Sequence, residues 1–361
     1  MVIGHWRQLD WFIIIPTVIL SGLGLAAIYN ASFYNHDFTD FNKQVVFLAI
    51  GLLIMFIFSR LDWRIFRDGP HLVTILYIIC LVSLVGLLLF TKGVHGSRSW
   101  YKIGVISIDP IEPVKIVLII LLAKYFSLRH VELYRIRHII FSGLYILVPA
   151  LLILLQPEVG SVIVLALIWV GVLLISGIKL RHFLALCLCG LLILSFSWLF
   201  LFKDYQKSRV LTFLSPSIAP LGSGWNQAQA RVAIGSGGLL GKGFVNATQV
   251  RYGFLPASKT DFIFASIVEE WGLLGAGLLL FCYGFIIWRI IKISLISQSN
   301  FPRLFSVGFV VVLISQTVIN ISMNLGLLPI IGVPLPFVSY GGSSLLASFW
   351  GLGIILSMEG K

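Results

Sequence analysis

Apolar runs separated by charged residues or by proline and glycine make up most of this chain. There are ten of them, at residues 11–30, 44–59, 72–90, 113–127, 138–155, 161–177, 183–202, 262–288, 304–326 and 341–358. Most approach the roughly 20 residues that a membrane-spanning helix needs, whereas a strand of a membrane barrel would show about 10 alternating residues. The pattern predicts an all-α polytopic membrane protein with about ten transmembrane helices, of which the eighth is long and tilted.

The composition supports this class. Of the 361 residues, 58% are hydrophobic and 11% are charged, which is far from a soluble domain. The net charge of +12 could suggest nucleic acid, but no soluble basic domain carries it, so we expect no nucleic-acid partner. The four cysteines lie inside apolar runs without the spacing of metal ligands. Arg7 precedes the first run and no small-residue cleavage site follows it, which favours a retained first helix over a signal peptide.

The short connections on one side of the predicted bundle are rich in arginine and lysine. The positive-inside rule places that side, with both chain termini, in the cytoplasm. The largest connection, residues 203–261, then lies on the extracytoplasmic side between the seventh and eighth helices. We expect one integral membrane domain over residues 1–361 that contains this loop.

Several cations fall on the side that the rule disfavours. Lys92, Arg98, Lys102 and Lys115 cluster around the third connection, where they could bind an anionic substrate or only pair with lipid phosphates. Glu112 lies three residues before Lys115, so both share one face of a helix start. A salt bridge that stabilises the helix start is the alternative to a functional pair.

The loop at residues 203–261 holds seven cations and two acids, Asp204 and Asp261. Asp261 opens the eighth helix and is the sharpest candidate for a catalytic residue, although the helix dipole alone would favour an acid there. Glu269 and Glu270 follow inside the same helix, and at least one of them should face a polar interior. Residues 222–243 contain Lys242 and seven glycines, and glycines allow backbone N–H groups to turn toward an anion. The spacing of these glycines is not that of a nucleotide-binding loop.

Further polar residues fall at predicted helix ends and along the ninth helix. Glu158 occupies an outer turn, either as a solvated residue or in a substrate or ion-pair role. Gln316, Asn320 and Asn324 form a polar stripe with helical spacing, which indicates interhelical hydrogen bonds or the lining of a groove. Ser343 belongs to a glycine- and serine-rich start of the last helix, whose free N–H groups could meet an anion.

Taken together, these runs resemble the SEDS family of bacterial envelope polymerases over nearly the whole chain. The most specific runs are residues 235–243, 248–249, 255–256, 260–265 and 329–344. Residues 261–265 and 324–329 look most like the RodA branch, whose paralogues are FtsW and SpoVE. The chain departs from the family at Ala257 and Lys259, where relatives commonly carry Glu and His. It also carries Asp-Pro-Ile-Glu at residues 109–112, where they commonly carry Gln-Pro-Ser-Glu.

The resemblance implies an enzyme of the bacterial cytoplasmic membrane that polymerises lipid II into glycan strands at the outer face during cell elongation and shape maintenance. It also implies partners, namely a class B penicillin-binding transpeptidase and other membrane proteins of the elongation complex. In the family, the aspartate that matches Asp261 is required for polymerisation. The motif that matches Glu112 and Lys115 belongs to the functional surface.

With this substrate, Asp261 is expected to act as general base, or to orient the acceptor, for attack of a sugar 4-hydroxyl on the anomeric carbon with inversion. The candidates for binding the substrate are Arg98, Glu112, Lys115, Lys242, Arg251 and Ser343. Supporting roles are expected for Glu158, Glu269, Asn320 and Asn324. A divalent cation, Mg²⁺ or Mn²⁺, is left open as a cofactor without assigned ligands, and no nucleotide is expected.

Two other functions remain open from the sequence. Polar residues at membrane depth, such as Glu269 and Asn320, would suit a flippase for lipid II. A non-enzymatic scaffold for the transpeptidase would not need Asp261. The crowding of charged motifs on one predicted face favours the polymerase.

Overall fold

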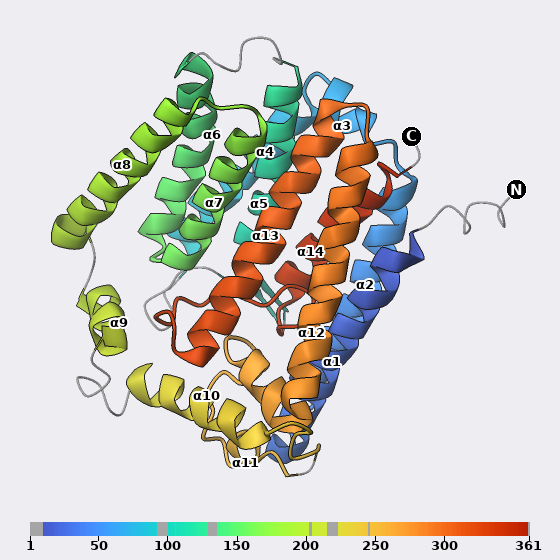
Figure 1. The fold of residues 1–361 in the computed structure, drawn as a ribbon, viewed down its shortest axis with the longest axis vertical. Coiled ribbons are helices and arrows are strands. Elements are labelled where there is room, and N and C mark those ends of the chain that lie inside the picture. The colour runs from blue at the N-terminus through green and yellow to red at the C-terminus, as the bar shows by residue number, and fades with distance from the viewer. Residues whose placement is uncertain are drawn as a thin grey trace, which may run out of the picture.

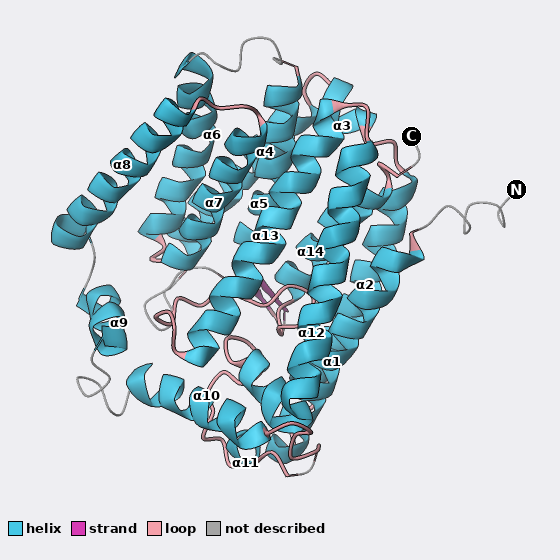
Figure 2. Ribbon diagram, viewed as in Figure 1, coloured by secondary structure: helices cyan, strands magenta, loops and turns pink. Residues whose placement is uncertain are grey.

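The computed structural model of the protein describes residues 10–91, 100–104, 106–128, 136–201, 204–214, 223–244 and 246–359. Most of them belong to helices, many of which run along the long axis of the molecule (Figures 1 and 2). In this part of the chain the strands are β1 (Tyr101–Ile103) and β2 (Ile106–Ile108), which pair antiparallel with Tyr101 opposite Ile108. This hairpin lies in the third connection, where the hydrophobic pattern predicted no strand.

Each of the ten apolar runs forms a helix. The helices are α1 (Trp11–Asn35), α2 (Thr39–Arg60), α4 (Leu72–Phe90), α5 (Ile111–Ser127), α6 (Ile136–Leu155), α7 (Val159–Ile175), α8 (Leu180–Phe196), α12 (Ile263–Ile296), α13 (Asn300–Leu325) and α14 (Gly342–Leu356). In the described chain, seven helices are long and apolar enough to cross a membrane, and α7 and α14 are shorter apolar helices. The protein is therefore a polytopic helical membrane protein, and the number of ten spans stays a prediction.

Helix α12 is long, as the sequence predicted, but it is not continuous. An unbroken helix of its 34 residues would measure about 51 Å, more than the roughly 30 Å of a bilayer core. The helix instead breaks at Gly272, which has φ 65° and ψ −158°. Beyond the break, the N–H groups of Leu273 and Leu274 donate to the carbonyls of Gly238 and Leu239. The break divides α12 into a short first segment and a longer second one, and the predicted tilt of the helix stays a prediction.

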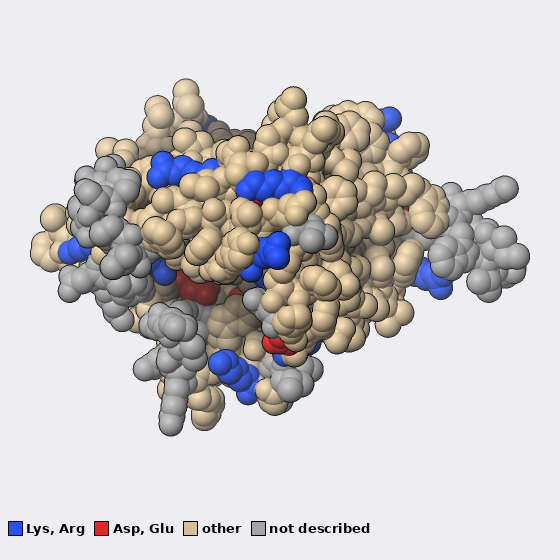
Figure 3. All heavy atoms as spheres, turned by 90° about the horizontal axis from the view of Figure 1, so that it is seen from below, with Lys and Arg blue, Asp and Glu red and all other residues tan. Residues whose placement is uncertain are grey.

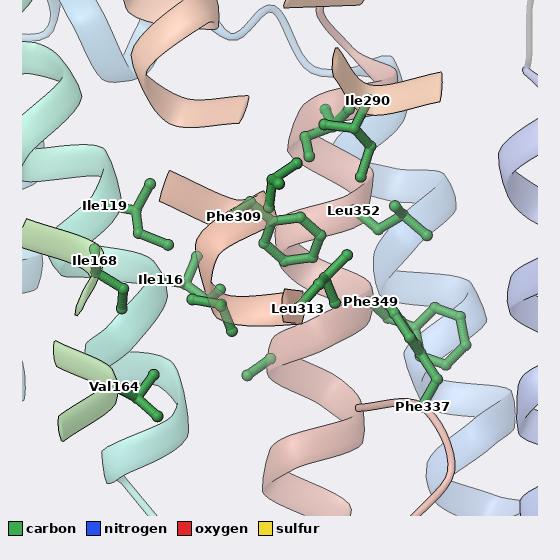
Figure 4. Close-up of a cluster of buried hydrophobic side chains, with 14 of the residues drawn as sticks. Ile116, Ile119, Val164, Ile168, Ile290, Phe309, Leu313, Phe337, Phe349 and Leu352 are labelled. Atoms are coloured by element: carbon green, nitrogen blue, oxygen red, sulfur yellow. The ribbon is translucent and has the colours of Figure 1, made fainter. Parts of the chain in front are cut away.

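Helix α13 packs against α5, α7 and α12 and forms the centre of the bundle. Phe309 and Leu313 of α13 lie in a buried cluster with Ile116 and Ile119 of α5 and Phe349 of α14 (Figure 4). In a bilayer such a cluster is held mainly by close packing, because lipid tails are as apolar as the side chains themselves. This packed layer carries the first turn of α5, where the charged pair of the candidate site lies.

The insertion at residues 203–261 is largely helical, with α9 (Asp204–Leu214), α10 (Ser223–Gly237) and α11 (Thr248–Arg251). Because its glycines have no side chain, the backbone of the insertion can pack directly against the backbone of α12. A Cβ atom at Gly237 would lie 2.1 Å from the carbonyl oxygen of Val268, and one at Gly241 would lie 2.2 Å from that of Glu270. The N–H groups of Lys242 and Gly243 donate to α12 carbonyls. The glycines therefore serve close packing, and the expectation that they turn their N–H groups toward an anion was wrong for these positions.

The two ends of the described chain meet at one end of the bundle. Arg289, near the C-terminal end of α12, forms ion pairs with Asp10 before α1 and with Glu359 after α14, the latter at 2.9 Å. This arrangement fits the expectation that both termini share one side of the membrane. Which side faces the cytoplasm stays a prediction.

Candidate active site

A pocket lined by four carboxylates lies at the opposite end of the bundle. The carboxylates belong to Asp109, Glu112, Glu158 and Asp261. The other lining residues are Trp100, Ser161, Thr260, Gly332, Pro334, Tyr340, Gly341, Ser343 and Ser344. Seen from this end, most of the charged groups on the surface are basic, one acidic group also reaches the surface, and another acidic group lies deeper in a hollow (Figure 3).

The pocket is small in this structure. Its free volume is about 80 Å³, which holds two or three water molecules at about 30 Å³ each. A sugar does not fit inside it. A sugar substrate would therefore have to bind at the mouth or separate the lining segments.

Two helix starts form one wall of the pocket. The N–H group of Asp109 donates to the hydroxyl of Ser343 at 2.8 Å, which connects the segment before α5 to the first turn of α14. The carboxylate of Asp109 accepts the N–H of Ile111 at 2.9 Å and so satisfies a free donor of the α5 terminus. Pro110 fits the helix start because it has no N–H to lose.

Glu112 and Lys115 form a buried ion pair on α5. Their side chains meet at 2.8 Å, and only 1% of the Lys115 side chain is exposed. Removing one partner of such a pair typically costs about 3–5 kcal/mol, because the other charge is left buried and uncompensated. Lys115 is therefore held by Glu112, and its positive charge lies behind the pocket lining.

The main chain of Asp261 is held by the polar stripe of α13. Its carbonyl accepts hydrogen bonds from the side-chain amides of Asn320 at 3.2 Å and Asn324 at 2.9 Å. The amide oxygen of Asn324 also accepts the N–H of Ala265 at 3.0 Å. The stripe that the sequence predicted thus joins α13 to the main chain of Asp261 and to the first turn of α12.

The Asp261 carboxylate itself is not engaged in this network. Among the residues that the structure describes, it makes no side-chain hydrogen bond. Burial raises the pKa of Asp261, and the guanidinium of Arg209 acts in the opposite direction. A free carboxylate with a raised pKa, on a fixed main chain, suits a general base.

Asp109 is a pocket residue that the sequence reasoning noticed only as a departure from the family pattern. Burial raises the pKa of Asp109 well above its ordinary value, and the nearby charges of Glu158 and Glu112 raise it further. Its position before a proline at a helix start, three residues from Glu112, was the available signal. Arg209 was counted only among the loop cations, and nothing in its local sequence marks it as the cation near Asp261.

Of the predicted substrate-binding cations, Lys242 and Arg251 do not line the pocket. Lys242 forms an ion pair with Glu269 at 3.0 Å and does not line the pocket. The guanidinium of Arg251 lies over the rings of Tyr34 and Tyr252, 5.6 and 5.5 Å from their centres. Arg98 lies outside the described residues. Roles for these three in holding substrate stay predictions.

The residues present fit a divalent cation only in part. Within the described ranges, no group of three or more His, Cys, Asp or Glu side chains is arranged to hold a metal ion. Mg²⁺ is commonly held by one or two carboxylates together with substrate phosphates, and the pocket offers carboxylates of that kind. A cation here would depend on the substrate for its remaining ligands.

The fold and the pocket define a polytopic helical membrane protein with a carboxylate site at one end of its bundle. Comparison with family models gives a match over residues 7–361 to the cell cycle proteins FtsW, RodA and SpoVE. The chain therefore belongs to this family, the SEDS family that the sequence resembled.

Individual relatives cover almost the whole chain. It is 35% identical over 349 residues to the peptidoglycan glycosyltransferase MrdB of Escherichia coli K12, covering 95% of this chain and 93% of the relative. It is 34% identical over 359 residues to the stage V sporulation protein E of Bacillus subtilis, covering 97% and 96%.

Solved structures agree with this assignment. A chain of a peptidoglycan synthase complex that coordinates polymerization and crosslinking is 31% identical, with a TM-score of 0.82 and 97% of both chains covered. The rod shape determining protein RodA of Thermus thermophilus is 27% identical, with a TM-score of 0.70 and 98% of both chains covered.

Proposed function

We propose that this protein is a peptidoglycan glycosyltransferase that polymerises lipid II at the outer face of the bacterial cytoplasmic membrane during cell elongation. The observation that carries the proposal is the Asp261 carboxylate, which has no hydrogen bond within the described chain and lines a pocket whose surroundings fix its backbone. Membership of a family that contains the glycosyltransferase MrdB supports the same reaction.

In the proposed reaction, Asp261 takes the proton of a sugar 4-hydroxyl on the acceptor. The hydroxyl oxygen forms a bond to the anomeric carbon of the donor, and the bond from that carbon to the phosphate oxygen breaks. Undecaprenyl pyrophosphate leaves with the bonding electrons, and attack from the opposite face inverts the anomeric centre. The pKa of Asp261, raised by burial, makes the carboxylate a better base than an exposed aspartate.

Charge that develops on the leaving pyrophosphate requires cations close by. Lys115 lies next to the pocket because it pairs with Glu112, which lines it. The positive charge of Arg209, on α9, lowers the pKa of Asp261. The hydroxyl of Ser343 is already an acceptor for Asp109, but its own proton can be donated to a substrate oxygen. A bound Mg²⁺ or Mn²⁺ would supply additional charge stabilisation, with Asp109, Glu112 or Glu158 as candidate ligands.

The flippase alternative is less well supported by the polar contacts. Glu269 and Asn320, which would have to form part of a path, are engaged in local hydrogen bonds with the chain itself. The scaffold alternative leaves the free Asp261 carboxylate without a role. A class B penicillin-binding protein is nevertheless the proposed partner, since a similar chain occurs in a complex that joins polymerization to crosslinking.

The proposal is tested with the purified protein, lipid II and a transpeptidase partner whose serine nucleophile has been removed, all in detergent. Glycan strands should appear on a denaturing gel as a ladder that disappears when this protein is left out. Detergent micelles have no separate compartments, so a flippase would give no product under these conditions. Absence of strands with folded, partner-bound protein would contradict the proposal.

A further inference from the structure

A second and larger pocket lies at the end of the bundle away from the carboxylates. Its volume is about 800 Å³, within the ordinary range for ligand sites. One wall is formed by Trp63 and the short helix α3 (Arg64–Asp68), and the other by the end of α12 and the residues that follow it. Nothing in the proposed polymerisation uses this pocket.

Two arginine side chains of this pocket stack on the ring of Trp63, which is itself stacked on another aromatic ring. Trp63 is only 2% exposed and stacks on Phe301 with ring centres 5.6 Å apart and an interplanar angle of 8°. The guanidinium groups of Arg67 and Arg64 lie 5.2 and 5.7 Å from the centre of the Trp63 ring. Stacking of this kind reduces the freedom of the arginine side chains before any ligand arrives.

These two arginines remain able to bind an anion. Arg64 pairs with Asp62 at 3.8 Å, and both side chains are largely exposed. Arg67 donates two hydrogen bonds to Asp68, at 2.6 and 2.9 Å, and one to the hydroxyl of Ser299 at 3.4 Å. The single exposed contact of Arg64 contributes little, so an incoming anion can replace it at small cost, whereas an anion would share the Arg67 guanidinium with Asp68. Arg289 also lines the pocket, but it is held by Asp10 and by Glu359.

Aliphatic side chains surround the basic wall. Ile293 and Ile296 line the pocket from α12, and Ile296 is 70% exposed although it lies at the end of a membrane helix. Ile65, between the two arginines, is 48% exposed. The buried indole N–H of Trp63 has no acceptor among the described residues. A ligand with an anionic head and an apolar tail would satisfy both kinds of surface.

We propose that this pocket binds an anionic phospholipid of the adjacent leaflet. Arg64 and Arg67 hold its phosphate, and Ile293 and Ile296 contact the first part of an acyl chain. Basic pockets between the inner ends of membrane helices are suited to such headgroups, and two guanidinium groups in fixed positions match the oxygens of a phosphodiester. The inference is independent of the polymerase reaction.

The test measures phospholipid retention by the purified full-length protein. In native mass spectrometry, the protein should retain phosphatidylglycerol in preference to phosphatidylethanolamine when both are added at equal concentration. The double variant Arg64→Gln/Arg67→Gln should bind phosphatidylglycerol roughly thirtyfold more weakly, as expected for the loss of two cations at a membrane surface. If the double variant does not fold, the single Arg64→Gln variant should show a loss of about fivefold.

A matched control removes two other cations from the same end of the bundle. Arg60 and Lys292 are exposed and do not line the pocket, so Arg60→Gln/Lys292→Gln should retain phosphatidylglycerol as the unaltered protein does. Equal losses in both double variants would overturn the proposal. So would equal retention of the two lipids, or displacement of phosphatidylglycerol by an equal concentration of inorganic phosphate, which would indicate a site for free phosphate.

Discussion

Two acidic side chains of the carboxylate pocket differ in what surrounds them. Glu112 is neutralised by Lys115 at 2.8 Å, and the pair is almost entirely buried. Asp261 has its main chain fixed by two asparagines, and within the described chain its carboxylate has no such partner. The difference separates a structural charge pair from a reactive group, and each can be tested alone.

The buried pair should respond to substitution as a unit. Glu112→Gln leaves Lys115 charged in a buried position, so we expect a loss of about 3–5 kcal/mol in the free energy of unfolding. The double variant Glu112→Gln/Lys115→Met removes both charges and should recover most of that loss. Thermal unfolding of the purified proteins in detergent measures both changes. A double variant less stable than the single one would show that the pair is not the source of the effect.

The protonation of Asp261 should control the acidic limb of the pH–rate profile. Burial raises its pKa, and Arg209 opposes that shift. Since the carboxylate form is the base, the rate should rise as pH passes through this pKa and level off above it. Arg209→Gln removes the opposing charge, raises the pKa further and should move the limb to higher pH. Lys207→Gln, in the same helix α9, serves as the control. Coincident profiles for Arg209→Gln and the unaltered protein would exclude the proposed coupling.

At the residue scale, the sequence predicted the side chains that carry strong local signals. Asp261, Glu112 and Lys115 stand out because charges at membrane depth are costly. Asp109 did not, because its raised pKa comes first from burial in the folded chain and then from the charge of Glu158, which lies in a turn far along the sequence. The ion pair between Lys242 and Glu269 could not be predicted from the sequence either, because it depends on how α12 packs against the insertion.

At the scale of elements, Glu269 fixes part of the insertion to α12. One of its carboxylate oxygens accepts hydrogen bonds from the Lys242 ammonium at 3.0 Å, the Thr248 hydroxyl at 3.1 Å and the Gln249 N–H at 3.0 Å. The contact lies close to the break at Gly272. The insertion is thereby attached to the same helix that begins just after Asp261.

Removal of this carboxylate should release the segment. Glu269→Ala should increase amide hydrogen exchange at Gln249 by at least about tenfold, because its N–H loses its acceptor and the neighbouring side chains lose their partner. Exchange measured by mass spectrometry on peptides covering residues 237–252 reports the change. Glu270→Gln is the control, since the side chain of Glu270 accepts a hydrogen bond from Asn30 at 2.6 Å and only its main-chain carbonyl, which the substitution keeps, contacts the insertion. Unchanged hydrogen exchange in Glu269→Ala would show that Glu269 does not anchor this segment to α12.

Element types were more predictable than element shapes. All ten apolar runs are helices because long apolar runs leave a membrane chain no other way to pair its backbone groups. The break at Gly272 was missed, since a glycine within an apolar run is compatible with a helix and only the close approach of Gly241 reveals its role. The hairpin of β1 and β2 is three residues per strand, too short for an alternating pattern to be recognised.

At the scale of the whole molecule, the two pockets lie at opposite ends of one helical bundle. The carboxylate pocket gathers residues from position 100 to position 344, so no local window of sequence could define its lining. The sequence predicted that these residues collect on one face of the bundle, and the extracytoplasmic orientation of that face, inferred from the charge distribution, stays a prediction. The packed layer around α13 holds that end in place.

The most direct measurement is glycan polymerisation from purified lipid II by Asp261→Asn, beside Asp37→Asn as a control for an exposed aspartate outside the pocket. Because burial raises the pKa of Asp261 in the folded protein, stability is lost as pH rises from the ordinary pKa of an aspartate through the raised one, so Asn should leave the midpoint of thermal unfolding at neutral pH unchanged or slightly higher. We predict that Asp261→Asn folds, binds its partner and forms no strands, while Asp37→Asn polymerises as the unaltered protein does. Strands of normal length and yield from Asp261→Asn would contradict the account.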